Sequence, residues 1–248
     1  MTESARHVAI ITGGTRGIGA AIAHALAARD VDLLLSGRNR DDEVDALIAA
    51  LDTKTNVGLH LADAGDPSTA TALVELAMQR FGRIDYLVPA AGGAVPGTAL
   101  SVSPEAWEEA FRVHVHAPFH LFRAAHGALA VRGGAMLLIS SVAGLRGCPG
   151  TVAYQTVKGA LPQMGRALAR DHGHEGIRIN TVCPGIIETR FHAAMTPEAR
   201  RNNLENRIPL RHFGTPENVA TASIELLTNP FITGETLVID GGMSMRMV

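Results

Sequence analysis

Tyr154 and Lys158 are the two residues whose types and spacing best suit proton transfer. They stand four positions apart, so on a helix they lie on the same face. A free tyrosine has a pKa of about 10 and is a weak base at neutral pH. A neighbouring ammonium group favours the phenolate and lowers that pKa, which would let Tyr154 exchange a proton with a bound oxygen atom. The alternative is an exposed pair on a helix surface with no chemical role.

Two serines precede this pair, at the end of an apolar run. The run "GAMLLISS" at 134–141 predicts a strand that ends on Ser140 and Ser141. A hydroxyl at a strand end can hold and orient the oxygen atom that Tyr154 would protonate. The residue types alone do not decide between Ser140 and Ser141.

The glycine-rich stretch "TGGTRGIG" at 12–19 is a candidate phosphate loop. Gly13, Gly17 and Gly19 allow a tight turn, close approach of a pyrophosphate and close packing of the following helix. The N-terminus of that helix would offer unpaired N–H groups to phosphate oxygens. No Gly-Lys-Ser/Thr ends the loop, which disfavours a nucleoside-triphosphate site. The alternative is an ordinary glycine-rich turn between a strand and a helix.

The stretch "FRVHVHAPF" at 111–119 places two histidines two positions apart in a predicted helix. Apolar residues at helical spacing place His114 on the inward face, and His116 points about 200° away at 3.6 residues per turn. Two histidines so placed cannot share one ion, and no carboxylate completes a motif, so we predict no metal site. Pro118 lacks the N–H that would bond the His114 carbonyl oxygen, which predicts a helix irregularity here.

Seven short apolar runs predict the buried parallel strands that would position these residues. The runs are 7–12, 31–36, 56–61, 84–90, 134–141, 177–184 and 236–242. Helical stretches lie between them, among them 20–29, 68–81 and 156–172. This alternation predicts right-handed βαβ units and therefore an α/β, doubly wound parallel sheet with helices on both faces. No linker or repeat divides the chain, so we expect a single domain over 1–248.

The composition excludes several classes of function. The chain has 248 residues, of which 46% are hydrophobic, enough for a sizeable core. A net charge of −2 gives no electrostatic case for binding nucleic acid or an anionic membrane. Two cysteines support neither a disulfide framework nor a cysteine-rich zinc module. Without a recognisable signal sequence or membrane-spanning run, we expect a cytoplasmic protein with no membrane or nucleic-acid partner.

The chain resembles the short-chain dehydrogenase/reductase family over essentially its whole length. The motifs that carry the resemblance are "TGGTRGIG" (12–19), "FGRID" (81–85), "SSVAG" (140–144), "YQTVK" (154–158), "INTVCPG" (179–185) and "GTPENVA…TGETLVIDGG" (214–242). They follow the family's order and spacing. The resemblance implies a Rossmann-type fold, a nicotinamide dinucleotide cofactor, and a small-molecule carbonyl or alcohol substrate. It also implies a homotetramer or homodimer, with the C-terminal "TLVIDGGMSMRMV" near the interface.

The resemblance assigns roles to individual residues. The family usually places its serine thirteen residues before the tyrosine, which selects Ser141. The predicted catalytic residues are Ser141, Tyr154, Lys158 and His114. By the same resemblance, Asp63 would accept from the adenine amino group. The residues expected to contact the cofactor are Gly13, Thr15, Arg16, Gly17, Ile18, Gly19, Arg38, Asp63, Ala64, Ala90, Ala91, Gly92, Tyr154, Lys158, Pro184, Gly185, Ile187 and Thr189.

The end of the second predicted strand indicates which dinucleotide is preferred. Gly37 occupies the position where NAD-preferring members of the family usually carry an acidic residue. Arg38 follows it and Arg16 lies in the phosphate loop, and two guanidinium groups could bind a 2′-phosphate. We therefore predict NADP(H) in preference to NAD(H). The alternative is that both arginines are solvated surface residues.

The chain departs from the family pattern at two places. Pro89-Ala90-Ala91-Gly92 stands where the family commonly has Asn-Asn-Ala-Gly, so hydrogen bonds are lost but the small residues remain. His114 stands where the family often has an asparagine that joins a water-mediated proton relay. Its imidazole would either move protons or simply pack in the core, and the sequence leaves both open.

We expect an NADP(H)-dependent oxidoreductase that interconverts a carbonyl and a secondary alcohol, with Tyr154 as the acid/base. The alternatives are a dinucleotide-binding sensor with impaired catalysis and an NAD-preferring alcohol dehydrogenase of the same family. The polar segment 188–213 follows a strand end and is expected to form a substrate loop over the carboxyl edge of the sheet. No motif identifies the substrate.

Overall fold

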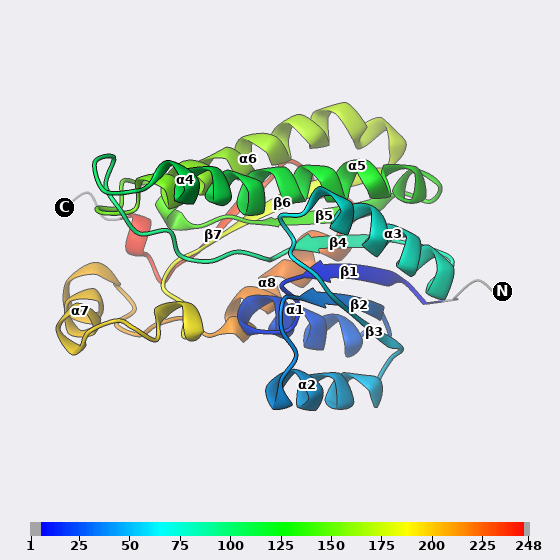
Figure 1. Cartoon of the computed structure of the whole chain (residues 1–248), viewed down its shortest axis with the longest axis horizontal. Helices are drawn as coiled ribbons and strands as arrows, with labels where there is room; N and C mark the ends of the chain where they lie inside the picture. Colours follow the sequence, from blue (N-terminus) through cyan, green and yellow to red (C-terminus); the bar gives the residue numbers. More distant parts are fainter. Residues whose placement is uncertain (1–5, 246–248) are drawn as a thin grey trace.

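The computed structural model describes residues 6–245, which fold around one parallel sheet (Figure 1). Its strands lie in the order β3-β2-β1-β4-β5-β6-β7. The strand bounds are β1 (Val8–Thr12), β2 (Asp32–Gly37), β3 (Val57–Leu61), β4 (Tyr86–Pro89), β5 (Gly134–Ile139), β6 (Ile177–Pro184) and β7 (Thr236–Ile239). The order reverses at β1, because the chain crosses from β3 back over β2 and β1 and places β4 on the other side of β1. Ligands bind at such a switch point in sheets of this kind.

Helices cover both faces of the sheet. The helices are α1 (Gly17–Ala27), α2 (Asp42–Asp52), α3 (Pro67–Phe81), α4 (Pro104–Phe111), α5 (Ala117–Ala130), α6 (Val152–His172), α7 (Pro197–Asn202) and α8 (Pro216–Thr228). One core cluster packs α1, α2 and α8 against one face, and the other packs α3, α5 and α6 against the opposite face. Figure 1 shows these two helical layers above and below the strands.

The alternation of buried side chains explains this arrangement. In β1, Ile11 points into one core cluster and Ile10 into the other, and both side chains are fully buried. Strands buried on both faces read as unbroken apolar runs, which is how the sequence displayed them. The predicted doubly wound parallel sheet is therefore confirmed.

The element bounds differ from the predicted ones mainly at their ends. The run 236–242 yields a strand that ends at Ile239, because Gly241 and Gly242 adopt φ of 65° and 86° and turn the chain. Residues 246–248 of the predicted interface segment lie outside the described residues, as do residues 1–5. Between residues 6 and 245, no helix is both long enough and apolar enough to cross a membrane.

The polar segment 188–213 leaves the sheet after β6. It contains a 3-10 turn (Arg190–His192), α7 and a π-helical turn (Asn203–Arg207), and a bridge between Ile187 and Gly214 closes its base. Figure 1 shows α7 beyond the carboxyl ends of the strands. The segment thus lies at the edge where the sheet order reverses and the candidate site is found.

Candidate active site

The phosphate loop has the geometry that its glycines predicted. Gly13 has φ of 64°, and a Cβ there would lie 2.6 Å from the Ala91 backbone nitrogen, so the two loops touch through main chain alone. Gly17 has φ of 52° and faces the Thr189 side chain, 3.4 Å from where its Cβ would lie. Among the described residues, no side chain caps the first turn of α1 at Arg16. The loop and the uncapped helix therefore fit the pyrophosphate of a dinucleotide.

Pro89 and Ala90 stand where the family commonly has two asparagines, and the N–H groups of Ala90 and of the following Ala91 both donate to Thr12. The Ala90 N–H donates to the Thr12 carbonyl oxygen at 2.9 Å, and the Ala91 N–H donates to the Thr12 Oγ1 at 3.5 Å. The β1–β4 edge keeps its main-chain pairing here without the asparagine side chains. The backbone of this stretch is therefore held in place despite the loss of the asparagine side chains.

Tyr154, Lys158 and Ser141 are brought together by α6 and the end of β5. The Lys158 Nζ donates to the Ile139 carbonyl oxygen at 2.7 Å and lies 5.7 Å from the centroid of the Tyr154 ring. Ser141 forms a hydrogen bond with Tyr154. Ser140 is buried and donates to the Lys158 carbonyl oxygen at 2.7 Å, so it anchors the helix backbone. The geometry thus selects Ser141 as the residue that faces Tyr154.

The predicted lowering of the Tyr154 pKa is wrong for this structure. Burial raises the pKa of Tyr154 above its usual value, the hydrogen bond from Ser141 lowers it, and Cys148 raises it. Lys158 is bonded to the Ile139 carbonyl oxygen, and burial lowers its own pKa to about 8. The Tyr154 hydroxyl is therefore protonated at neutral pH.

His114 is the buried centre of a π-helix, Arg112–His116, between α4 and α5. This confirms the predicted irregularity and the inward direction of the ring, while His116 is exposed. The His114 ring meets the Tyr154 ring edge-on, with centroids 5.9 Å apart, and its Nε2 lies 3.2 Å from the Gly93 carbonyl oxygen. A Cβ on Gly92 would lie 2.4 Å from the His114 Cε1. The ring therefore packs directly onto the glycine loop after β4.

Burial determines the charge of His114. Burial first, and then the charge of Lys158, lower the pKa of His114 to about 3, against a small opposing effect of the Gly93 hydrogen bond. Within the described residues, its Nδ1 is buried without a hydrogen-bond partner. The imidazole is therefore neutral over the whole physiological pH range.

Position 37 is closed to an acidic side chain by its surroundings. A Cβ on Gly37 would lie 2.6 Å from the Thr15 Oγ1. Arg38 beside it is exposed and contributes to lowering the pKa of Asp63. The end of β2 therefore lacks an acidic residue and has no room for one at position 37.

Arg16 is already paired in this structure. Its guanidinium contacts Asp41 at 2.5 Å and Glu43 at 2.6 Å, at the N-terminus of α2, and Arg190 also pairs with Glu43. The sequence reasoning missed these acidic partners, although the run Asp41-Asp42-Glu43 was the available signal. Two carboxylates neutralise Arg16, so the two predicted arginines are not equivalent.

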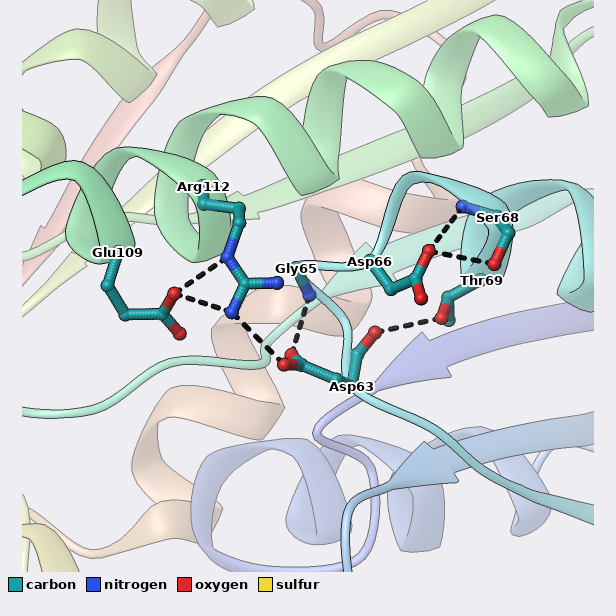
Figure 2. A network of polar contacts seen from close by, with 7 residues as sticks. All are labelled: Asp63, Gly65, Asp66, Ser68, Thr69, Glu109 and Arg112. Atoms are coloured by element: carbon teal, nitrogen blue, oxygen red, sulfur yellow. Dashed lines mark hydrogen bonds and ion pairs between the residues drawn. The ribbon is translucent and has the colours of Figure 1, made fainter. Parts of the chain in front are cut away.

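Asp63 lies in a polar network that joins the loop after β3 to α4 and the π-helix (Figure 2). One carboxylate oxygen accepts the Gly65 N–H at 2.9 Å, and the other lies 3.1 Å from Arg112, which also pairs with Glu109. Chiefly through the Gly65 bond, these contacts lower the pKa of Asp63. The Asp63 side chain is still 44% exposed, so these contacts leave it accessible from solvent.

The loop after β6 faces the phosphate loop and Tyr154. The Ile187 carbonyl oxygen accepts hydrogen bonds from the Thr189 hydroxyl at 3.4 Å and pairs with the His192 Nδ1 at 2.9 Å. The Phe191 ring lies 5.6 Å from the Tyr154 ring, centroid to centroid, and is 42% exposed. No sequence pattern pointed to Phe191, because only the folded loop brings its ring to Tyr154. Phe191 forms an apolar wall beside the Tyr154 ring.

The comparisons with known proteins agree with this geometry. Residues 13–244 match a family model described as enoyl-(acyl carrier protein) reductase. A 3-oxoacyl-(acyl-carrier-protein) reductase, FabG, of Chlamydia muridarum is 31% identical, covering 95% of this chain and 96% of its own length. Carbonyl reductase family member 4 of Xenopus laevis is 32% identical, covering 97% of this chain and 99% of its own.

Solved structures show the same likeness. A short-chain type dehydrogenase/reductase from Mycobacterium ulcerans superposes with a TM-score of 0.90 at 25% identity, covering 99% of this chain and 92% of its own. A blue fluorescent protein from a metagenomic library, in complex with NADPH, gives a TM-score of 0.88 at 32% identity, with coverages of 97% and 98%. The chain belongs to the short-chain dehydrogenase/reductase family and is an NAD(P)-dependent oxidoreductase.

Proposed function

We propose that this protein is an NADP(H)-dependent reductase that converts a small-molecule carbonyl into a secondary alcohol. The observation that carries the proposal is the arrangement of Ser141, Tyr154 and Lys158 at the carboxyl edge of the sheet, beside an uncapped glycine-rich helix N-terminus. The relatives include proteins named as 3-oxoacyl and carbonyl reductases, which supports a carbonyl substrate.

The residues of the glycine loops would hold the dinucleotide. Its pyrophosphate would lie against Gly13, Gly17 and the first turn of α1, and its nicotinamide beside Ile187 and Thr189. When bound there, the reduced cofactor supplies the hydride for the carbonyl carbon.

Tyr154 would donate the proton that the reduced carbonyl oxygen requires. Its raised pKa keeps the hydroxyl protonated at neutral pH, which suits the reductive direction. Ser141 would hold the carbonyl oxygen next to that hydroxyl. The ammonium of Lys158 would stabilise the tyrosinate left after donation, because it lies 5.7 Å from the ring centroid in a buried setting.

His114 would act as a packing residue in this site and not as a proton carrier. With a pKa of about 3, its imidazole does not take up a proton at neutral pH. The ring would instead fix the position of Gly92 and Gly93 and the orientation of Tyr154, through the contacts described above. This favours the core interpretation of His114 among those that the sequence left open.

The preference for NADP(H) rests on Gly37 and Arg38. An acidic side chain at 37 would repel a 2′-phosphate, and the position holds no side chain. The exposed guanidinium of Arg38 would pair with that phosphate. Arg16 supports the preference less than the sequence suggested, because Asp41 and Glu43 already neutralise it.

The proposal also includes a homo-oligomeric state and a cytoplasmic location. β7 pairs with β6 at the edge of the sheet, and the Leu237 and Val238 side chains on it are each 37% exposed. An exposed apolar edge strand is normally covered, and a second copy of this chain is the proposed cover. The mass of the protein in solution measures this directly.

A carbonyl panel with both cofactors tests the proposed function. We expect oxidation of NADPH, followed by its near-ultraviolet absorbance, with at least one ketone, aldehyde or 3-oxoacyl thioester. NADH should be used less efficiently. Tyr154→Phe should still bind NADPH but lose turnover, since the proton donor is gone and the loop is intact. A wild-type protein that binds NADPH and reduces no carbonyl would favour the sensor instead.

A further inference from the structure

Three potential metal ligands meet on the surface away from the active site: His126, His172 and Glu175. The Glu175 Oε2 lies 2.8 Å from the His126 Nε2 and 2.8 Å from the His172 Nδ1. One nitrogen of each histidine and one carboxylate oxygen all lie within 4.8 Å of one another. The side chains are 35%, 25% and 27% exposed, so an ion can reach them from solvent.

The fold creates this cluster from segments far apart in the sequence. His126 lies on α5, while His172 is the last residue of α6. After α6 the chain makes a 3-10 turn, Gly173–Glu175, which keeps Glu175 beside the helix end; Gly176 then adopts φ of 76° and ends the turn. His126 and Glu175 are 49 positions apart, so no local sequence motif predicted that the three residues would meet.

An apolar residue holds both rings in place. The centroid of the Phe122 ring lies 4.9 Å from that of His172 and 5.9 Å from that of His126. The two imidazoles are themselves 4.9 Å apart, edge to face. Rings fixed in this way lose little freedom when they bind an ion, which lowers the cost of binding.

The donor set and its dimensions suit a borderline divalent ion. Two imidazoles and one carboxylate are a recurrent zinc set, with the fourth position left to water. Around a tetrahedral ion with bonds of about 2.0–2.1 Å, the donor atoms are about 3.3 Å apart. The pairs at 2.8 Å would need to open by about half an ångström to admit the ion, within the reach of small side-chain rotations.

We propose that His126, His172 and Glu175 bind one divalent ion of the zinc class, which ties α5 to the end of α6. The site is separate from catalysis, because His172 lies fourteen residues beyond Lys158 on α6, roughly 20 Å along the helix axis. Its ion would therefore stabilise the fold without touching the substrate. The sequence predicted no metal site, on the separation of His114 from His116 and the lack of a cysteine-rich zinc module.

The test uses untagged protein freed of metal with a chelator and then dialysed. Titration with Co²⁺, followed by its visible d–d absorption, and with Zn²⁺ by calorimetry should give one ion per chain. The melting temperature should rise with Zn²⁺. Glu175→Gln and His126→Gln should each weaken binding by more than about 100-fold, since loss of a ligand costs at least as much as loss of its support. Near-ultraviolet circular dichroism verifies that each variant is folded.

His174→Gln is the matched control, because His174 is exposed and stands in the same turn. It should bind the ion as the wild type does. The proposal is overturned if the wild type binds no ion at one per chain. It is also overturned if Glu175→Gln binds as tightly as the wild type, or if His174→Gln loses binding to the same degree. The three residues would then form a metal-free hydrogen-bonded group.

Discussion

Replacing His114 by Asn should make the stability of the protein less sensitive to acid. In the folded protein, burial lowers the pKa of His114 from 6.5 to about 3. In the unfolded chain the imidazole takes up a proton below pH 6.5, while the folded chain stays neutral there. The unfolded state therefore binds more protons between these values, and the free energy of unfolding falls as the pH falls from 6.5 towards 3.

The size of the effect follows from this shift. Each pH unit below 6.5 costs about 1.4 kcal/mol, so His114 alone should remove about 2 kcal/mol of stability at pH 5. Asparagine does not titrate, so the variant lacks this loss. Any cavity that the smaller side chain leaves lowers stability equally at both pH values and cancels in the comparison. Turnover should persist, because the family often has asparagine at this position.

Urea unfolding at neutral pH and at about pH 5 measures the effect in the wild type and the variant. We expect the wild type to lose about 2 kcal/mol more than His114→Asn between the two conditions. His24 and His192, whose pKa values burial also lowers, contribute equally to both proteins. His116→Asn, which changes an exposed neighbour, should behave as the wild type. Equal losses in wild type and His114→Asn would refute a buried, neutral His114.

Three further changes test neighbouring parts of the site. Gly92→Ala would place a Cβ 2.4 Å from the His114 Cε1; thermal unfolding should show about 1–3 kcal/mol of destabilisation, smaller when His114 is already Asn. Gly37→Asp should weaken NADPH binding, measured by fluorescence titration, and unchanged NADPH affinity would contradict the proposed preference for NADP(H). NADH binding should improve only when Thr15 is also replaced by Ala, because the Thr15 Oγ1 would lie 2.6 Å from the new Cβ. The pKa of Lys158 is lowered to about 8, so the side chain is a charged ammonium only below about pH 8. The value of kcat/KM for NADPH should therefore decline as the pH rises through 8, and a flat profile would show that this charge does not contribute to turnover.

The fold was largely predictable because its determinants are local. Buried parallel strands such as β1 are unbroken apolar runs, and Gly13 and Gly17 in the loop after it adopt the positive φ that favours glycine. The spacing of Tyr154 and Lys158 places them on one face of any helix. The irregularity at His114 followed from Pro118, which cannot donate a backbone hydrogen bond.

The rest depended on contacts between distant segments. The partners of Arg16 come from the N-terminus of α2, and the Phe191 ring reaches Tyr154 from the loop after β6. The pKa of Tyr154 was predicted with the wrong sign, because the spacing to Lys158 showed proximity but not burial or the carbonyl oxygen that binds its ammonium. Burial, hydrogen-bond partners and the pKa values that depend on them are set by tertiary packing, which a local sequence pattern does not reveal.

Transfer of deuterium from NADPH labelled at the transferred position tests the central claim most directly. The assay uses any carbonyl that the protein reduces, and mass spectrometry locates the label in the product. We predict an alcohol with one deuterium on its carbinol carbon from the wild type, and none from Tyr154→Phe at equal occupancy by NADPH. Label released to water, or labelled alcohol formed equally by Tyr154→Phe, would contradict hydride transfer with Tyr154 as the proton donor.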